Sequence, residues 1–321
     1  MAAERRVAAM GTDAHVIVVG EDADHLADAA TERIEELEAR WSRFRPTSEV
    51  TRINAGAGTW VPVSTDTTML VARAKEAWRL SAGFVDCTLL PQLEAAGYDA
   101  SFADLPASRA NADVPPVPPV SLLGPVDIDV SADAVRLPVG LGFDPGGIGK
   151  GLAADLVSDE LVRAGAAGVC VNLGGDLRVR GTGPDGRAWT VSIDHPDQPA
   201  PLALVGLADG AVATSTTLRR RWTVGGVERH HLIDPRTGTS STTDLVLVAV
   251  VARSAWLAEV LAKGVLLRGS PHPFDLVDGT GAHALVVDRD GRITASAGLP
   301  AYLGGQPLPE RIRPRDVGMA S

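Results

Sequence analysis

Cysteine is scarce in this chain, with only Cys87 and Cys170 among 321 residues. Each stands in a segment with the pattern of a strand, and two cysteines so placed fit neither a disulfide framework nor a thiolate metal site. Disulfides are rare in reducing compartments. The scarcity of cysteine therefore leads us to expect a cytoplasmic protein.

Long apolar runs and excess positive charge are also missing. The longest apolar runs, such as LVLVAVVA at 245–252, fall far short of the ~20 residues that span a bilayer. We therefore expect no membrane segment. The 40 acidic residues outnumber the 30 basic ones, which gives a net charge of −10. That charge is opposite to the one expected of a protein that binds phosphate backbones, so we expect no nucleic-acid partner.

The first 20 residues lack the pattern of a cleaved export signal, and we interpret HVIVVG at 15–20 as the first strand. Aromatic residues make up only 4% of the chain, so the core is expected to consist mainly of Val, Leu and Ala. The 34 glycines and 22 prolines predict many turns and short elements. A proline-rich stretch at about 100–120 predicts a surface excursion. The composition of residues 306–321 predicts a flexible tail.

Apolar periodicity predicts helices and short strands that alternate irregularly. The helices are expected at 22–42, 65–82, 150–164 and about 255–267. Strands are expected at 168–173, 189–194, 203–207, 211–214, 222–224, 245–251, 284–287 and 293–297. Runs of strands with a few helices favour an α+β fold in which mixed or antiparallel sheets pack with helices.

A glycine-rich turn at 143–155, FDPGGIGKGLAAD, leads into one of these helices. Glycines let backbone amides approach an anion, the start of a helix offers unpaired N–H groups, and Lys150 adds a cation. This pattern is typical of phosphate binding, although it is neither a P-loop nor a dinucleotide fingerprint. A tight turn with a surface lysine is the alternative.

Four further segments carry polar groups. VNLGGDLRVRG at 171–181 places Asn172 and Asp176 at a glycine turn, which could bind a ligand or form an ordinary hairpin. RHHLIDPRTG at 229–238 has two adjacent histidines, of which only one can face a given pocket. The three arginines at 219–221 favour a solvated charge run. Glu259 and Lys263, four apart on one helix, favour a surface ion pair.

The order and wording of these segments resemble the FAD:protein FMN transferase family, also called the ApbE family. The matching pieces cover nearly the whole chain: MGT at 10–12, WSRFRPTSEVTRIN at 41–54, FVDCTLLPQLEAAGYD at 84–99, DPGGIGKGLAAD at 144–155, VNLGGDLRVRG at 171–181, VATS at 212–215 and HLIDPRTG at 231–238. The resemblance implies one domain over 1–305 with two sub-lobes and FAD in a central cleft. It also implies an activity: cleavage of the FAD pyrophosphate, transfer of FMN to a Thr or Ser hydroxyl of a target flavoprotein, and release of AMP.

The resemblance also implies roles for individual residues. His231 would be the base that deprotonates the acceptor hydroxyl, oriented by Asp234 or a nearby backbone group. Positive charge for the phosphates would come from Lys150, the glycine amides and Arg236. The residues expected to contact FAD are Met10, Phe44, Ala96, Gly97, Tyr98, Asp144, Lys150, Asn172, Leu232 and Lys263.

The expected metal site departs from the family pattern. The Gly147 carbonyl is expected beside a bound cation, and the family typically has an Asp followed four residues later by a Thr, both serving Mg²⁺. Glu259 and Lys263 occupy those two places here. Glutamate can bind Mg²⁺ but lysine cannot. We therefore expect Lys263, paired with Glu259, to stand where the metal would be and to contact the phosphates itself, and the need for Mg²⁺ is left open.

Two alternative functions follow from these departures. Water could replace the acceptor hydroxyl, which would give FMN and AMP by hydrolysis. A protein that keeps the cleft but not the cation site could instead bind FAD without catalysis. The sequence VATST, where the family usually has a glycine after the serine, also favours this last alternative.

Overall fold

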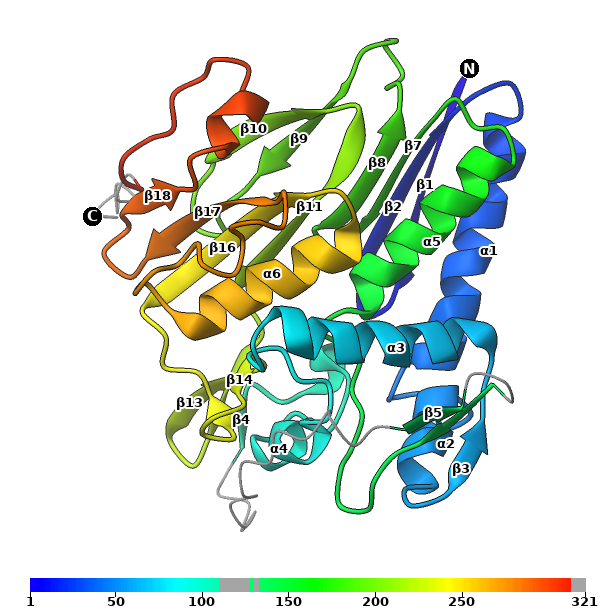
Figure 1. The fold of residues 1–321 in the computed structure, drawn as a ribbon, viewed down its shortest axis with the longest axis vertical. Coiled ribbons are helices and arrows are strands. Elements are labelled where there is room, and N and C mark those ends of the chain that lie inside the picture. Colours follow the sequence, from blue (N-terminus) through cyan, green and yellow to red (C-terminus); the bar gives the residue numbers. More distant parts are fainter. Residues whose placement is uncertain (110–126, 130–132, 313–321) are drawn as a thin grey trace, which may run out of the picture.

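The computed structural model describes residues 1–109, 127–129 and 133–312. Its centre is an eight-stranded sheet in which every neighbouring pair of strands is antiparallel (Figure 1). The strands, in spatial order, are β1 (Ala2–Ala9), β2 (Thr12–Val19), β7 (Gly168–Leu173), β8 (Asp176–Gly181), β11 (Asp209–Thr216), β16 (Leu245–Ala252), β17 (His283–Asp288) and β18 (Ile293–Ala295). This arrangement confirms the expected α+β fold.

Three helices cover one face of the sheet. They are α1 (Ala23–Trp41), α5 (Gly149–Arg163) and α6 (Ala255–Arg268), and Figure 1 shows them across the sheet. Helix α6 is buried on nearly all sides, since it packs against α5, the sheet and helix α3 (Thr65–Leu80). A helix so enclosed leaves no solvent face for its polar residues, so any charge on it must find a partner inside the protein.

Asp155 ties the two central helices together. Its carboxylate, on α5, accepts hydrogen bonds from the backbone N–H groups of Ala255 at 2.8 Å and Trp256 at 3.0 Å, which open α6. These N–H groups have no partner within their own helix, and a carboxylate suits the positive end of the helix dipole. Burial nevertheless raises the pKa of Asp155 to about 6. This carboxylate therefore helps to fix the relative position of α5 and α6.

The other face of the sheet has a separate apolar core. A hairpin of β9 (Trp189–Ile193) and β10 (Ala203–Leu207) and the short helix η2 (Leu299–Tyr302) pack there. This second layer lies away from the helices and contributes no side chain to the cavity described below.

A smaller part of the chain lies below the three helices in Figure 1. It contains helices α2 (Glu49–Ala55), α3, α4 (Leu90–Ala95) and η1 (Phe102–Asp104), together with short strands. Those strands are β3 (Trp60–Pro62), β4 (Ser108–Arg109), β5 (Asp127–Asp129), β6 (Ala134–Arg136), β12 (Arg221–Val224), β13 (Val227–His230), β14 (Ile233–Asp234) and β15 (Thr239–Ser240).

The sequence located the four long helices and most of the long strands, and two expectations need correction. The first strand is β1, which pairs along its whole length with β2, so 15–20 belongs to the second strand. Residues 306–312 are not a free tail, because the backbone N–H of Ile293 donates to the Glu310 carbonyl at 2.9 Å and that of Ile312 to the Gly291 carbonyl at 2.8 Å.

Most of the proline-rich stretch and residues 313–321 lie outside the described residues. No helix in the described ranges is both long and apolar enough to cross a bilayer.

Gly151 allows the close contact between α5 and α6, and its replacement by alanine tests that contact. A Cβ at this position would lie 2.6 Å from the Ala255 carbonyl oxygen, which is backbone and cannot move freely. We expect Gly151→Ala to lower the free energy of unfolding by about 2 kcal/mol, as overpacking does. The measurement is denaturant unfolding followed by circular dichroism.

Gly206→Ala is the matched control, because a Cβ there would meet nothing within 4 Å. It should change the free energy of unfolding by less than about 0.5 kcal/mol. Equal stabilities of the two variants would contradict the packing argument.

Candidate functional site

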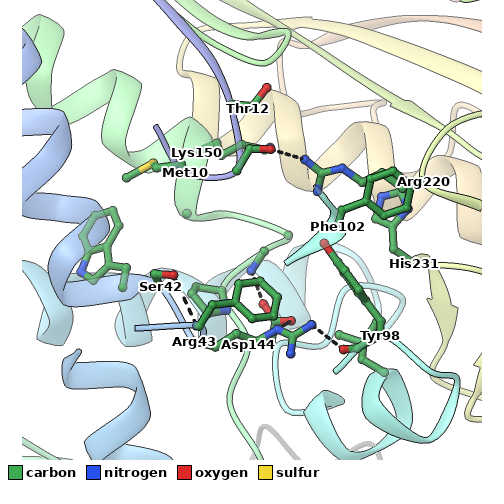
Figure 2. Close-up of a pocket in the computed structure, with 18 of the residues that line it drawn as sticks. Met10, Thr12, Ser42, Arg43, Tyr98, Phe102, Asp144, Lys150, Arg220 and His231 are labelled. Carbon is green, nitrogen blue, oxygen red and sulfur yellow. Dashed lines mark hydrogen bonds and ion pairs between the residues drawn. The ribbon is translucent and has the colours of Figure 1, made fainter. Parts of the chain in front are cut away.

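A cavity of about 700 Å³ opens where the helical face of the sheet meets the smaller part of the chain. Its wall combines the turn between β1 and β2, the start of α5, residues from the loop after α1 and the segment that contains His231. Figure 2 shows side chains from these distant segments around it. A volume of this size suits a ligand of several hundred daltons.

The turn between β1 and β2 forms one wall. Met10 and Gly11 both have left-handed backbone, with φ of 52° and 66°, and Met10, Gly11 and Thr12 line the cavity. Arg220 donates a hydrogen bond to the Gly11 carbonyl at 3.3 Å and also lines the cavity. The turn that closes the edge hairpin of the sheet is therefore part of the site.

The glycine-rich turn leads α5 into the same cavity. Gly147, Gly149 and Lys150 line it, and Asp144 Oδ1 accepts a hydrogen bond from the Gly146 N–H at 2.7 Å. At the start of α5 the Gly149 N–H donates to the Pro145 carbonyl at 2.8 Å and the Gly151 N–H to Glu259 Oε2 at 2.9 Å. The N–H groups of Gly147 and Lys150 have no hydrogen-bond partner among the described residues, so these two stay open to an anion. The arrangement favours the phosphate-binding interpretation of this segment over a tight turn with a surface lysine.

Lys150 is not a surface lysine. Its ammonium forms ion pairs with Asp176 and, at 3.0 Å, with Glu259. Burial opposes its charge, but the two carboxylates outweigh burial and raise the pKa of Lys150. Burial, and then the charge of Glu259, raise the pKa of Asp176 to about 6. These three side chains form a buried charge cluster that joins α5, β8 and α6.

Glu259 is not part of a surface ion pair with Lys263, as its helical spacing had suggested. Its Oε1 binds Lys150, and its Oε2 accepts the Gly151 N–H at 2.9 Å. Lys263 lies instead against the glycine-rich turn, with its ammonium where a Cβ on Gly147 would be. Burial lowers the pKa of Lys263, and its ammonium has no hydrogen-bond or ion-pair partner among the described residues.

The two adjacent histidines have different surroundings. His230 is buried with its Nε2 2.9 Å from the Ser241 carbonyl, and its Nδ1 accepts the Leu232 N–H at 3.3 Å. His231 lines the cavity. This confirms that only one of the pair faces the pocket, and it gives His230 a structural position.

The imidazole of His231 is held neutral. Burial, and then the positive charges of Arg220 and Lys263, lower its pKa well below the ordinary value of 6.5. Its Nδ1 is buried and has no hydrogen-bond partner within the described part of the chain. Figure 2 shows His231 beside Arg220 at the cavity. A neutral imidazole with an unused nitrogen can accept a proton from a ligand or acceptor.

Asp234 is not placed to orient His231. Its carboxylate accepts hydrogen bonds from the backbone N–H of Arg236 at 2.9 Å and from the guanidinium of the same residue. Arg236 extends over the ring of Phe84 and is largely exposed, so it does not line the cavity. The Asp-Pro-Arg-Thr-Gly turn therefore shapes the segment around His231 without contributing its charges to the site.

An aromatic wall lies across the cavity from the glycine-rich turn. Tyr98 stands between Phe44 and Phe102, with ring centroids 6.0 Å and 6.4 Å apart. Arg43 lies 4.0 Å from the Phe44 ring and 4.8 Å from the Tyr98 ring, pairs with Asp144 at 3.0 Å, and donates to the Tyr98 carbonyl at 2.7 Å (Figure 2). Aromatic faces held in this way suit a planar ring system.

Nine of the fourteen expected site residues line the cavity: Met10, Phe44, Tyr98, Asp144, Gly147, Lys150, His231, Leu232 and Lys263. The other five lie beside it. Ala96 and Gly97 pack behind Tyr98 on Trp222, whose indole donates to the Ala96 carbonyl at 2.7 Å. Asn172 accepts the Gly175 N–H at 2.8 Å within its hairpin, which agrees with the ordinary-hairpin alternative. Asp234 binds Arg236, and Glu259 binds Lys150 and the Gly151 N–H.

Sequence reasoning did not assign several residues of the wall to the site, and three of them bear on its chemistry. Arg220 was assigned to a solvated charge run, yet its left-handed backbone, with φ of 51°, and its bond to Gly11 bring it to the cavity. Arg43 and Phe102 were not singled out at all. The position of Arg43 directly before Phe44 is the only signal in the sequence that could have drawn attention to it.

The residues present do not fit a magnesium ion. Both oxygens of Glu259 already have partners, and the ammonium of Lys263 lies at the turn where the ion would need ligands. No group of three or more His, Cys, Asp or Glu side chains that could hold a metal occurs among the described residues. Mg²⁺ prefers several oxygen ligands in near-octahedral geometry.

The chain matches the model of the ApbE family over residues 10–286. It belongs to the ApbE family. A curated relative, the FAD:protein FMN transferase of Vibrio cholerae, is 29% identical over 245 residues, which cover 74% of this chain and 71% of the relative. The protein of the same name from Haemophilus influenzae is 24% identical over 308 residues, or 90% and 87% of the two chains.

Solved ApbE structures share the fold. The ApbE protein of Thermotoga maritima superposes with a TM-score of 0.83 at 25% identity, over 94% of this chain and 99% of that one. The flavin transferase ApbE of Vibrio cholerae gives a TM-score of 0.80 at 24% identity, again over 94% and 99%. The ApbE fold thus accounts for the layered sheet and the helices that position the cavity.

The ion pair between Arg43 and Asp144 joins the aromatic wall to the glycine-rich turn of this ApbE cavity. Both side chains are mostly buried, with 6% and 12% exposed. Removing one partner leaves the other charge uncompensated, so we expect Arg43→Met to cost about 3 kcal/mol of unfolding free energy. The double variant Arg43→Met/Asp144→Asn should cost less than the sum of the two single variants, measured by denaturant unfolding.

The control for this double-mutant cycle is Arg6→Met, which breaks the exposed pair with Glu4. It should leave stability unchanged within experimental error. Additive single effects in the Arg43 and Asp144 cycle would contradict the coupling.

Proposed function

We propose that this protein transfers the FMN half of FAD to a threonine or serine hydroxyl of an acceptor flavoprotein and releases AMP. The observation that carries the proposal is the convergence on one cavity of a glycine-rich turn at a helix start, buried lysines, a neutral histidine and an aromatic wall. Its membership of the ApbE family and its curated relatives, named FAD:protein FMN transferase, support the same activity.

The chemistry needs two opposite electrostatic environments within a short distance. The acceptor oxygen must lose a proton as it attacks phosphorus, and the pyrophosphate must be neutralised while its bridging bond breaks. A new oxygen–phosphorus bond forms to FMN, the bond to AMP breaks, and the proton of the hydroxyl passes to the imidazole of His231. Negative charge that develops on the leaving phosphate is met by the start of α5, Lys150 and Lys263.

The low pKa of His231 matters for this role. A base must be unprotonated before it can accept a proton, and burial beside Arg220 and Lys263 keeps the imidazole neutral near pH 7. The same cations that depress its pKa would be partly neutralised by the bound phosphates, which would make the imidazole a stronger base once the substrate is in place.

The aromatic wall supplies the other half of the recognition. Phe44, Tyr98 and Phe102 offer ring faces to a flavin or an adenine, and Arg43 stacks on two of those rings.

The acceptor is proposed to be a cytoplasmic flavoprotein, and the two free, buried cysteines are compatible with a reducing compartment.

Replacement of His231 separates catalysis from binding. We expect His231→Ala to reduce the rate of FMN transfer at least ~10²-fold, as loss of a general base does, while FAD affinity changes only a few-fold. The assay incubates the protein with FAD and an acceptor flavoprotein fragment that bears the hydroxyl, and mass spectrometry follows the products. His25→Ala, at an exposed position on α1, is the control and should retain full activity.

The products also discriminate among the candidate functions. An acceptor that gains FMN supports transfer, free FMN with AMP would indicate hydrolysis, and intact FAD in the presence of acceptor would indicate binding alone. Full transfer activity in His231→Ala would remove this histidine from the mechanism.

The pH dependence of transfer follows from the lowered pKa of His231. Because a lowered pKa keeps the imidazole neutral to lower pH, we expect kcat/KM to stay constant between about pH 6.5 and 8 and to fall only below that range. Initial rates at low FAD concentration measure this, since kcat/KM reports the free enzyme. An acid limb with its midpoint at or above the ordinary histidine pKa would contradict the assignment.

A further inference from the structure

The buried charge cluster beside the cavity is complete without a metal ion. With Lys263 beside it, the cluster of Lys150, Asp176 and Glu259 has two ammonium groups against two carboxylates, so the formal charges cancel when all are ionised. Glu259 divides its two oxygens between Lys150 and the Gly151 N–H. A divalent ion added to this cluster would leave buried positive charge without a counter-charge.

Lys263 lies beside that cluster but pairs with none of its members. Its side chain leaves α6 one turn beyond Glu259 and ends against Gly147, at the glycine-rich turn that lines the cavity. Glycine at 147 is what makes room for it, because any Cβ there would overlap the ammonium. No described residue pairs with this ammonium, although it lies in a half-buried position where an unpaired charge is costly.

An anion that enters the cavity beside α5 would supply the missing partner. The backbone N–H groups of Gly147 and Lys150, which have no hydrogen-bond partner among the described residues, and the ammonium of Lys263 all belong to residues that line this cavity, and Lys263 lies against Gly147. Charge-assisted contacts of this kind are the usual means of holding phosphate. The ammonium also excludes a divalent cation from the same place by direct repulsion.

We propose that Lys263 acts as a built-in cation that binds the pyrophosphate of FAD directly, so that this protein binds FAD without a divalent metal. The proposal rests on the proposed function in taking FAD as the ligand. It concerns the binding step, however, which can be measured without an acceptor and without turnover.

The first experiment needs no variant. The full-length protein is stripped of metal with EDTA, and FAD is titrated with flavin fluorescence as the readout, in EDTA and again in excess Mg²⁺. We expect the two dissociation constants to agree within about threefold. Binding that requires Mg²⁺ would overturn the proposal.

The second experiment removes the charge. Lys263→Met keeps the length and the apolar stem of the side chain, and we expect it to weaken FAD binding at least about tenfold both in EDTA and in Mg²⁺. FMN, which has no pyrophosphate, should lose less affinity than FAD. Unchanged FAD affinity in Lys263→Met would overturn the role of this lysine, even if binding proved metal-independent.

Arg268→Met is the matched control on the same helix. Arg268 pairs with Asp275 near the surface and does not line the cavity, so FAD affinity should be unchanged. Circular dichroism and thermal unfolding establish that both variants are folded.

The outcomes separate this inference from the proposed function. Metal-independent FAD binding without FMN transfer to any acceptor would uphold the role of Lys263 and reject the transferase. FMN transfer to an acceptor, together with FAD binding that requires Mg²⁺, would uphold the transferase and reject the role of Lys263. Absence of FAD binding under every condition would overturn both.

Discussion

The ammonium of Lys150 joins three parts of the fold that are far apart in sequence. It stands at the start of α5 and pairs with Asp176 at the start of β8 and with Glu259 in the middle of α6. Glu259 then returns to α5 through the Gly151 N–H. Because an unpaired buried charge is costly, each of these groups requires the others, and the floor of the cavity can form only when helix, strand and helix are all in register.

This dependence explains why the two sides of the site differ in character. The side formed by α5 and α6 is rigid and charged, held by the cluster around Lys150 and by the Asp155 carboxylate at the start of α6. The opposite side is aromatic. The guanidinium of Arg43 is paired and stacked there at once, and Tyr98 also packs against Trp222, with ring centroids 5.4 Å apart. A ligand with phosphates at its centre and flat rings at its ends matches this division.

The sequence predicted the parts of the fold that follow from local periodicity. The helix α1 shows apolar residues at helical spacing, and the buried strand β7 was located with its observed bounds. By contrast, β1 was missed because it is an edge strand with only Ala3 and Ala9 buried among its apolar residues, so that pairing with β2 rather than burial defines it. Short helices such as α2 and α4 give too few turns for a periodic signal.

The site was predictable where a motif brings its residues together and unpredictable where the fold does. The glycine-rich turn, Lys150 and His231 stand in recognisable segments. The partner of Glu259 is a different matter: helical spacing favours Lys263, four residues away, whereas the tertiary structure supplies Lys150 from a distance of 109 residues along the chain. Arg220 was missed for a similar reason, because its contact with Gly11 spans 209 residues.

The hairpin of β1 and β2 makes the edge of the sheet part of the binding site. Its turn, with Met10 and Gly11 in left-handed backbone, lies in the cavity wall, and Arg220 holds it there. Shortening β1, or pulling on it through a fused tag or a surface attachment, would therefore shift a wall of the cavity as well as fray the sheet margin. Labels and immobilisation handles are better attached elsewhere on the molecule.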